Sequence, residues 1–451
     1  MTDLRAQLEK IVGAGGLVEQ ADLKTRMGWP PYQCAAAYLA RPADSAQVAA
    51  VLAACHAAGQ SVVTHGGRTG LAGGAISQPG DIVLSLERFN RIEEIDVAGR
   101  TMTLGAGVVL EAAQKAAADA GLMLAADWGA RGSATIGGGI ATNAGGNQVL
   151  RYGMMREQVL GLEAVLADGT VVSSMNRMLK NNAGYDLKQL FIGTEGTLGI
   201  VTRAVLRLRA APAETYSALA ACADFDAVAA LLDHMDRRMS GALAAYEVMW
   251  RDFYDLVHGA VSPPPLPPGH AFYVLVEAAG QGDADAFEAA LGEAIEQDIV
   301  ADAVLAQSGR ERDAFWAVRD NIPALMALAP IRTYDVSMPL SAMGDYVADV
   351  RGQLQAELGI ARVAVFGHVG DGNIHIILGL EDATPDRAHA ADTIVYDRLV
   401  PIGGSVSAEH GVGVEKRPFL DRSRSAAEIA LMRQLKTALD PKNILNPGKV
   451  I

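Results

Sequence analysis

The sequence predicts an α+β protein with two domains, on the basis of its length, its glycine distribution and the order of its predicted elements. At 451 residues the chain is too long for one ordinary domain. Residues 1–210 mix helical and stranded patterns around glycine-rich loops, without a regular βαβ repeat. After residue 210 the glycine density falls and strands alternate with helices, which is typical of an antiparallel sheet backed by helices.

The predicted elements of the first part begin with two helices. Apolar residues recur at helical spacing over residues 3–12 and 45–58, and Asp44 or Ser45 is a suitable N-cap for the second helix. Further on, Asp168-Gly169 is a strong hairpin signal. The other predicted elements are strands at 62–64, 81–86, 100–104, 159–167 and 170–173, a strand ending at 208, and an alanine-rich helix at 109–120 that ends at Gly121.

The second part is predicted to contain both strands and helices. A proline-rich stretch at 262–269 reads as a stiff loop between them. The predicted elements are strands at 216–221, 242–249 and 271–276, helices at 225–238 and 283–297, and a last helix at 426–439.

Composition excludes several classes of protein. Half of the residues are hydrophobic, but no uncharged apolar run is long enough to form a transmembrane helix. A net charge of −14 argues against a nucleic-acid partner. Cys34, Cys55 and Cys222 show no paired spacing, so reduced thiols are expected. The N-terminus lacks a targeting pattern, so we expect a cytoplasmic protein and leave peripheral membrane association open.

The stretch 62–74 is predicted to cradle an anion. A short β-branched run leads into a loop with five glycines, whose backbone N–H groups can face a common centre. Arg68 and Thr69 can add a charge and a hydroxyl, so the pyrophosphate of a dinucleotide is the expected ligand. The alternative is a glycine-rich surface turn.

Two more glycine-rich segments follow, at 133–147 and 188–200. Small residues let the backbone lie against a flat ring system, and the hydroxyl and amide side chains of the first segment can hydrogen-bond the polar edge of that ring. The alternative is that these small residues only pack a helix against a sheet.

Histidine and acidic residues gather in two further glycine-rich turns. His368 follows a predicted strand and His375 lies on the next, so the two imidazoles are expected to converge at one end of a sheet. Glu409 stands beside His410 in a later turn. Two histidines and one glutamate are a suitable ligand set for a divalent metal, whereas each residue taken alone could be structural or solvated.

Most of the chain resembles the FAD-dependent D-2-hydroxy-acid dehydrogenases of the vanillyl-alcohol oxidase superfamily, which include D-2-hydroxyglutarate dehydrogenase, D-lactate dehydrogenase and the glycolate oxidase D subunit. By contrast, no Gly-x-Gly-x-x-Gly typical of nicotinamide-binding proteins is present. The segments that carry the resemblance are 66–74, 136–138, 141–146, 151–153, 185–199 and the tail 440–449.

The resemblance implies an FAD-binding domain of the PCMH type at 1–210, a cap domain with the metal site at 211–410, and a segment at 411–451 that returns to the FAD domain. FAD is expected to bind non-covalently, since the histidines that tether flavin in some relatives have no clear counterpart, although His65 lies beside the first loop. Its expected contacts are Gly66, Gly67, Arg68, Thr69, Gly70, Gly73, Gly74, Ser133, Thr135, Gly137, Gly138, Thr142, Asn143, Gly145, Gly146, Ile200 and Asn446.

The resemblance also implies the roles of the residues in the chemistry. His368, His375 and Glu409 correspond to metal ligands, with Zn²⁺ as the expected ion, and His410 corresponds to the base that takes the hydroxyl proton. Asn373 is expected to bind the substrate and to orient the site. The expected reaction is oxidation of a D-2-hydroxy acid to the 2-oxo acid, with hydride transfer to FAD.

Substrate binding is expected to involve Arg319, which corresponds to an arginine that binds the substrate carboxylate. The sequence departs from the D-2-hydroxyglutarate dehydrogenase pattern at Pro323, where relatives have threonine, and at Thr333, where they have lysine. Neighbouring Arg332 is a candidate to supply the missing charge, so the identity of the acid stays open.

The expected electron acceptor is a quinone or an electron-transfer flavoprotein. An oxidase that uses oxygen, a flavin subunit that needs partner subunits as the glycolate oxidase D subunit does, and a catalytically silent metal-binding protein remain alternatives. A homodimer is compatible with the sequence.

Overall fold

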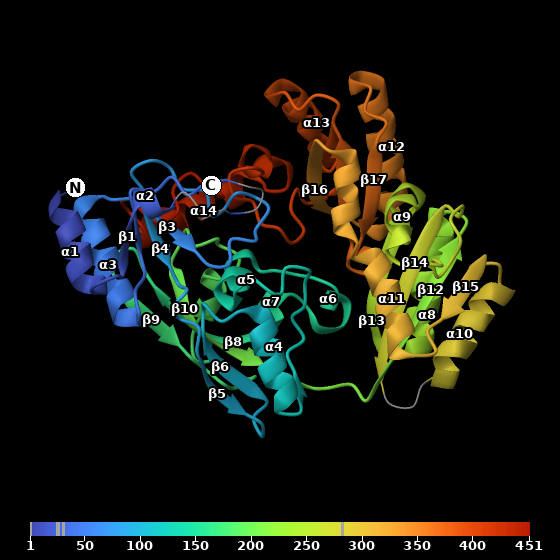
Figure 1. Ribbon diagram of the computed structural model, residues 1–451, viewed down its shortest axis with the longest axis horizontal. Coiled ribbons are helices and arrows are strands. Elements are labelled where there is room, and N and C mark those ends of the chain that lie inside the picture. The colour runs from blue at the N-terminus through green and yellow to red at the C-terminus, as the bar shows by residue number, and fades with distance from the viewer. Residues whose placement is uncertain (1, 24–27, 29–31, 281–283) are drawn as a thin grey trace. The chain divides into compact units, whose positions relative to one another are not determined.

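The computed structural model describes residues 2–23, 28, 32–280 and 284–451. Within this part the chain divides into two compact units (Figure 1). The first contains residues up to 146, 153–211 and 409–451, and the second contains 147–152 and 212–408. The sequence-based boundaries lie at 210/211 and 410/411, and they do not separate out the short segment 147–152.

That short segment includes helix α6 (Val149–Tyr152), which packs against strand β13 (Leu243–Trp250) of the second unit. Arg151 explains the attachment. Its guanidinium donates to the backbone carbonyl oxygens of Ala242, at 3.1 Å, and of Ala279. A charged group that satisfies two strand-end carbonyls fixes this segment on the second unit.

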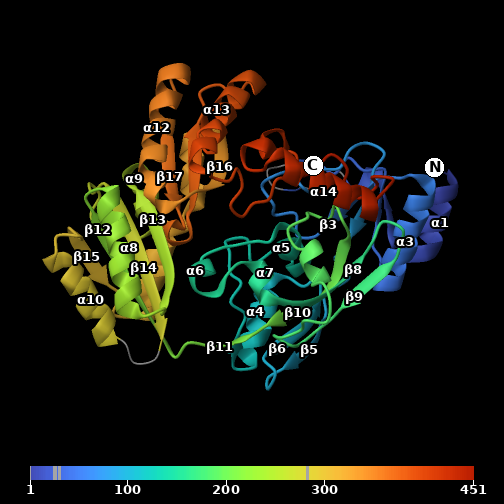
Figure 2. The same ribbon diagram turned by 180° about the vertical axis from the view of Figure 1, so that it is seen from behind.

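The first unit contains a mainly parallel sheet and an antiparallel sheet, both with helices against them (Figures 1 and 2). The strands of the first sheet, in spatial order, are β1 (Leu17–Glu19), β2 (Tyr38–Ala40), β4 (Ile82–Ser85) and β3 (Val62–His65). Those of the second sheet are β5 (Ile92–Asp96), β6 (Thr101–Gly105), β10 (Ile200–Arg207), β8 (Val159–Val165) and β9 (Val171–Ser174). The short strands β7 (Leu122–Met123) and β11 (Arg209–Ala210) pair separately.

The helices of the first unit bury their apolar sides against these sheets. Leu8, Val51 and Leu84 belong to one core cluster, and Leu110, Ile140 and Leu206 belong to another. The helices are α1 (Thr2–Val12), α2 (Gln20–Leu23), α3 (Ser45–Ala58), α4 (Leu110–Asp119), α5 (Ile136–Thr142), α7 (Met155–Gln158) and α14 (Ala426–Leu439), with 3₁₀ turns η1 (Leu187–Leu190) and η6 (Arg417–Arg422).

Local sequence signals determine several of these elements as predicted. Asp44 caps α3, since its carboxylate accepts from the Gln47 N–H at 2.8 Å, and Gly59 ends the helix with a φ of +64°. The hairpin around Asp168 is confirmed by the antiparallel pairing of β8 and β9. One element differs from expectation: the glycine run 136–142 forms the short helix α5.

The C-terminal segment adds to the first unit beside β3. The Val62 N–H donates to the Ile444 carbonyl at 2.7 Å, and the Asn446 N–H donates to the Val62 carbonyl at 2.8 Å. Inside this segment Asp440 accepts from Lys436 at 2.5 Å and from the Leu445 N–H at 2.8 Å. The nearly inaccessible Asp440 therefore sets the turn that delivers Asn446 to the first glycine loop.

The second unit is built on one antiparallel sheet. In the part of the unit that the structure describes, the strands lie in the order β15 (Asp302–Leu305), β12 (Glu214–Cys222), β14 (Phe272–Gly280), β13, β17 (Val363–Gly367), β18 (Asn373–Gly379) and β16 (Ile331–Ser337). The remaining elements are α8 (Phe225–Met239), α9 (Arg251–Val257), η2 (His258–Ala260), α10 (Ala284–Glu296), α11 (Gly309–Arg319), η3 (Ile322–Leu328), α12 (Leu340–Leu358), η4 (Val369–Asp371), α13 (Pro385–Asp397) and η5 (Val400–Ile402). The predicted antiparallel sheet backed by helices is confirmed.

Strand register decides which residues share a face of this sheet. Asp335 on β16 pairs with His375 on β18, and His375 pairs in turn with Phe366 on β17. These residues therefore lie on one face, the face that α9, α11 and η3 cover with apolar side chains. Tyr246 and Tyr334 lie on the other face, where their hydroxyls bond Val228 on α8 and Asp392 on α13.

No helix in the described ranges is both long and apolar enough to cross a bilayer.

Buried tyrosines predict how the second unit responds to alkali. Burial raises the pKa of Tyr246, Tyr334 and Tyr346 above the ordinary value of 10. Above pH 10 the unfolded chain loses these protons while the folded chain keeps them, so stability present below pH 10 is lost as the pH rises. We expect the free energy of unfolding to fall by about 1.4 kcal/mol per pH unit for each such tyrosine.

Urea unfolding followed by circular dichroism between pH 8 and about pH 11 would measure this slope. Tyr346→Phe is the matched variant, because its hydroxyl bonds a single backbone carbonyl, that of Val395. In this variant, the free energy of unfolding should fall with pH less steeply, by about 1.4 kcal/mol per pH unit. An unfolding midpoint that stays constant across the range would contradict the prediction.

Candidate active site

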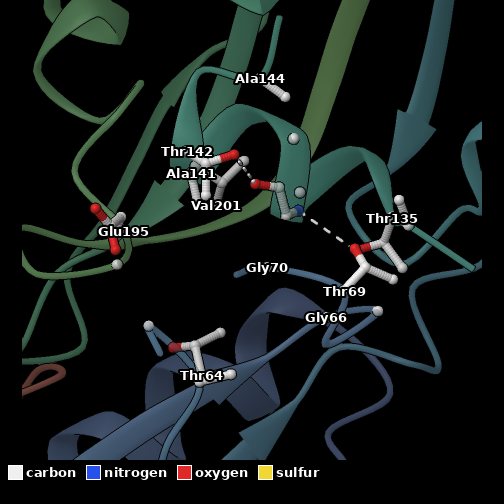
Figure 3. Close-up of a pocket in the computed structure, with 18 of the residues that line it drawn as sticks. Thr64, Gly66, Thr69, Gly70, Thr135, Ala141, Thr142, Ala144, Glu195 and Val201 are labelled. Carbon is white, nitrogen blue, oxygen red and sulfur yellow. Dashed lines mark hydrogen bonds between the residues drawn. The ribbon is translucent and has the colours of Figure 1, made fainter. Parts of the chain in front are cut away.

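A glycine-lined cleft of about 160 Å³ lies within the first unit (Figure 3). Its walls come from the first glycine loop, from α5, from the loop before β10 and from the C-terminal segment. Figure 3 shows Thr69 beside Thr135 on one side of the cleft and Glu195 on the other. Small residues and a few polar side chains line the cleft, which suits a cofactor that packs closely against the backbone.

Glycine is required where the first loop meets the second segment. A Cβ on Gly67 would lie 2.2 Å from the Ser133 carbonyl oxygen, and one on Gly66 would lie 2.5 Å from Thr135 Oγ1. Any side chain at either position would therefore push the two segments apart. Arg68, the next residue of the loop, has a φ of +58°. This left-handed conformation makes the chain turn sharply.

Helix α5 brings a run of glycine backbone to the cleft. Thr135 caps it, with Oγ1 accepting from the Gly138 N–H at 3.3 Å, and Thr142 Oγ1 donates to the Gly138 carbonyl at 3.2 Å (Figure 3). A Cβ on Gly137 would lie 2.6 Å from that of Ala106. Tertiary packing therefore overrides the low helix propensity of glycine here.

Most of the predicted FAD contacts line this cleft. Those that do are Gly66, Gly67, Arg68, Thr69, Gly70, Gly74, Thr135, Gly137, Gly138, Thr142, Ile200 and Asn446. Gly73, Ser133, Asn143, Gly145 and Gly146 are not among its lining residues. Asn143 instead accepts from the Arg156 N–H at 2.8 Å, and a Cβ on Gly146 would lie 2.0 Å from the Asp127 carbonyl oxygen, so both positions hold the loop together.

These observations fit FAD. Backbone amides of a glycine loop and a capped helix can hold the pyrophosphate, and the small residues leave a flat wall for the ring. Asn446 donates from Nδ2 to the Gly74 and Glu195 carbonyls, while its buried Oδ1 has no hydrogen-bond partner among the described residues. A buried acceptor of that kind at the cleft wall suits a polar cofactor.

Glu195 is a cleft residue that sequence reasoning assigned no role. Its carboxylate accepts from the Val412 N–H at 2.6 Å and from the Gly413 N–H at 2.9 Å. Burial raises the pKa of Glu195, and these hydrogen bonds oppose that rise. The acid thereby fixes the turn that follows His410. The sequence signal that could have pointed to it is an acidic residue inside a glycine-rich loop, at Gly193-Thr194-Glu195-Gly196.

His410 lines the same cleft as the glycine loops. Its Nε2 lies 3.8 Å from Oε1 of the preceding Glu409, and both side chains are partly accessible. An imidazole at the wall of a cofactor cleft is placed to exchange a proton with a ligand bound there.

His368 and His375 converge within the second unit, as predicted. Their ring centroids are 5.6 Å apart and their planes are nearly perpendicular. Asp335, which is fully buried, lies 4.0 Å from His375 Nδ1 and accepts from Asn373 Nδ2 at 3.0 Å. Asn373 Oδ1 is buried with no partner in the described ranges. Two imidazoles with carboxylate and amide oxygens nearby could supply some of the ligands of a divalent metal.

Glu247 is the other residue that sequence reasoning missed. It is 1% exposed on β13, and its carboxylate lies 2.6 Å from His368 Nδ1 and 2.9 Å from Arg319 Nε. Burial by itself would raise the pKa of Glu247, but the neighbouring His368 and Arg319 outweigh burial and lower the pKa to about 2. One charged residue in an otherwise apolar strand, Leu243 to Trp250, was the available signal.

Arg332 and Thr333 project from opposite faces of β16. Arg332 forms an ion pair with the buried Asp392 on α13, on the same face as Tyr334. Thr333 shares a face with Asp335, and therefore with His375. Arg332 therefore does not share a face with His375. A charged residue one position away from the expected lysine lies on the opposite face of the sheet.

Comparison with known proteins agrees with this architecture. The family described as FAD binding domain matches residues 36–174, and the family described as FAD linked oxidases, C-terminal domain, matches residues 211–450. Among solved structures, p-cresol methylhydroxylase with substrate bound is similar at a TM-score of 0.81 and 17% identity, covering 99% of this chain and 96% of that one. The PCMH-type α+β fold is thus confirmed.

Curated relatives are more similar in sequence. A D-2-hydroxyglutarate dehydrogenase of Xanthomonas citri pv. viticola is 40% identical, covering 100% of this chain and 97% of its own. The mitochondrial D-2-hydroxyglutarate dehydrogenase of Bos taurus is 38% identical over 92% of this chain and 76% of its own. A putative mitochondrial D-lactate dehydrogenase of Schizosaccharomyces pombe is 35% identical over 91% of this chain and 81% of its own.

The fold, the cofactor cleft and the matched domains define an FAD-dependent oxidoreductase. Within that class, the chain belongs to the FAD-dependent D-2-hydroxy-acid dehydrogenase family of the vanillyl-alcohol oxidase superfamily.

Proposed function

We propose that this protein oxidises a D-2-hydroxy acid, such as D-2-hydroxyglutarate or D-lactate, to the 2-oxo acid, with FAD and a divalent metal, Zn²⁺, as cofactors. The observation that carries the proposal is that His410 lines the glycine-walled cleft that fits FAD. Relatives named D-2-hydroxyglutarate dehydrogenase and D-lactate dehydrogenase support the substrate class.

The cofactors would be held by separate sets of residues. FAD would lie against the first glycine loop and α5, and when bound it accepts the hydride from the substrate carbon. The metal would be held by His368, His375 and Glu409, and when bound it supplies positive charge to the substrate oxygens. His368 and His375 are buried and their ring centroids lie 5.6 Å apart, so both could reach one ion once His368 Nε2 exchanges its contact with Arg319 for the metal.

His410 takes the proton of the substrate hydroxyl in this proposal. A neutral imidazole carries a ring-nitrogen lone pair that can accept that proton. Glu195 supports this role, because its hydrogen bonds to Val412 and Gly413 hold the backbone immediately after His410. The imidazole is thereby kept at the wall of the cleft.

Arg319 binds the substrate carboxylate. Its guanidinium is 6% exposed and is held at Nε by Glu247, which restricts its orientation. A planar guanidinium binds a carboxylate with two parallel hydrogen bonds, so a fixed orientation favours one substrate pose. Thr333 and Pro323, both exposed, stand where relatives have lysine and threonine, and we propose that the second substituent of the acid meets fewer charges here.

The substrate class is tested by screening D- and L-2-hydroxy acids for reduction of an artificial dye by the purified protein. We expect activity with D-isomers alone. Activity that requires added subunits would support a partner-dependent flavin subunit. We propose a quinone or an electron-transfer flavoprotein as the acceptor, and rapid reoxidation of the reduced flavin by oxygen in stopped flow would instead identify an oxidase.

Replacing Arg319 by lysine is expected to weaken substrate binding. Lysine keeps the charge beside Glu247 but cannot make the bidentate contact, so KM should rise about tenfold to a hundredfold, equivalent to about 1.5–3 kcal/mol. The kcat should change much less. Steady-state kinetics with the best D-2-hydroxy acid measures both. Arg310→Ala, at an exposed position on the same helix, is the control, and equal KM values for R319K and R310A would contradict the role.

A further inference from the structure

Glu247 joins two residues that the proposed reaction uses for different purposes. Its Oε1 lies 2.6 Å from His368 Nδ1, and its Oε2 lies 2.9 Å from both Nε and Nη2 of Arg319. His368 follows β17, Arg319 ends α11, and Glu247 lies on β13, so the three residues come from distant parts of the sequence. The carboxylate is 1% exposed and thus sheltered from water.

We infer that Glu247 is a positioning residue that fixes the tautomer of His368 for metal binding and, with its other oxygen, the orientation of Arg319 for the substrate carboxylate. This inference rests on the proposed function. It adds a single acidic residue on which both metal affinity and substrate affinity depend.

The tautomer follows from the neighbours of His368. An ionised carboxylate can only accept a hydrogen bond, so Nδ1 of His368 must carry a hydrogen and donate it to Glu247. Arg319 can only donate, and its Nη2 lies 3.4 Å from His368 Nε2. Both contacts therefore require the lone pair to be on Nε2. A metal would bind His368 through this lone pair in place of the Arg319 N–H, and a carboxylate on the opposite ring nitrogen makes Nε2 a stronger ligand.

The orientation of Arg319 follows from the second carboxylate oxygen. Contact with both Nε and Nη2 aligns the plane of the guanidinium with Oε2. Phe366 lies under the same group, with its ring centroid 4.9 Å from Cζ. A guanidinium confined by a carboxylate edge and an aromatic face has few orientations left, so less entropy is lost when it binds a substrate.

Glu277 provides a matched control. It lies on the neighbouring strand β14, is 8% exposed, and also anchors helix α11, since it accepts from Trp316 Nε1 at 3.0 Å and from Ser217 Oγ at 2.7 Å. Among the residues that the structure describes, Glu277 makes no hydrogen bond or ion pair with His368 or Arg319. Glu277→Gln therefore removes a buried charge from the same sheet without touching the proposed site.

The test compares Glu247→Gln with Glu277→Gln in the full-length FAD-loaded protein. Zn²⁺ affinity is measured by competition with a chromophoric chelator, which does not depend on turnover, and KM and kcat are measured with the best D-2-hydroxy acid. We expect E247Q to lose about 10–100-fold in Zn²⁺ affinity. KM should rise together with that loss, while E277Q stays close to the unmodified protein in both measurements.

Loss of a buried partner can also destabilise the fold, so circular dichroism accompanies each variant. If E247Q does not fold, Glu247→Asp takes its place. It keeps the charge, but its shorter side chain cannot reach both His368 and Arg319, so it should also lose Zn²⁺ affinity and raise KM. Unchanged Zn²⁺ affinity and KM in a folded Glu247 variant would overturn the inference, as would equal losses in E277Q.

Failure of the proposed function gives a different result. If the unmodified protein and His375→Ala bind Zn²⁺ equally, the metal assignment itself is wrong, and the inference about His368 falls with it. If the unmodified protein binds Zn²⁺ and His375→Ala does not, the metal assignment stands, and the Glu247 variants then decide the inference on their own.

Discussion

Replacing His410 by alanine should leave FAD bound but slow its reduction by substrate about 10²–10⁴-fold, the usual contribution of a general base. The reason is that His410 lines the cofactor cleft without forming its glycine floor. The backbone after it stays fixed by Glu195, which bonds the N–H groups of Val412 and Gly413 rather than the imidazole. Removal of the ring should thus remove proton transfer and spare cofactor binding.

Anaerobic stopped flow at the flavin absorption band would measure this reduction. Dithionite, which reduces flavin without needing a protein base, is the control, and it should reduce the flavin of both proteins equally. Substrate reduction at an unaltered rate in H410A would exclude His410 as the base. Loss of FAD on purification would instead show that the residue supports the cleft itself.

The parts of the fold that could be predicted are those set by local sequence. The cap of α3 at Asp44 and the hairpin at Asp168 depend on contacts within a few residues, so their signals are visible in the chain. Helix α5 was not predicted because six of the seven residues at 136–142 are glycines or β-branched residues, which disfavour helices. Its stability comes from the Thr135 cap and from packing against Ala106, which lies 31 positions from Gly137 in the sequence.

In the candidate site, too, features set by nearby residues could be predicted and features set by distant contacts could not. The convergence of His368 and His375 could be predicted, because they flank one tight turn between paired strands. Glu247 and Glu195 could not be assigned, since their partners lie 121 and 218 residues away. The expectation that Arg332 supplies the missing charge is not supported for a different reason. Neighbouring residues of a strand point to opposite faces, so a charge displaced by one position cannot replace the expected lysine.

Removing the metal should abolish turnover without removing FAD. The two cofactors would be held by different residues: the proposed metal ligands His368 and His375 belong to the second unit, whereas the glycine-lined cleft belongs to the first. Without the positive charge of the cation, the substrate hydroxyl keeps its high pKa and His410 cannot deprotonate it efficiently. EDTA followed by desalting should therefore reduce activity to background, and added Zn²⁺ should restore it.

Three variants make this prediction specific. His375→Ala and Glu409→Gln change proposed ligands in different units, and each should lower the Zn²⁺ content and the activity together while the flavin spectrum is kept. His389→Ala, at an exposed position on α13, should behave like the unmodified protein. Elemental analysis alongside dye reduction measures both quantities. Full activity in protein shown to be free of metal would remove the cation from the mechanism, and His410 and Arg319 would then have to activate and orient the substrate alone.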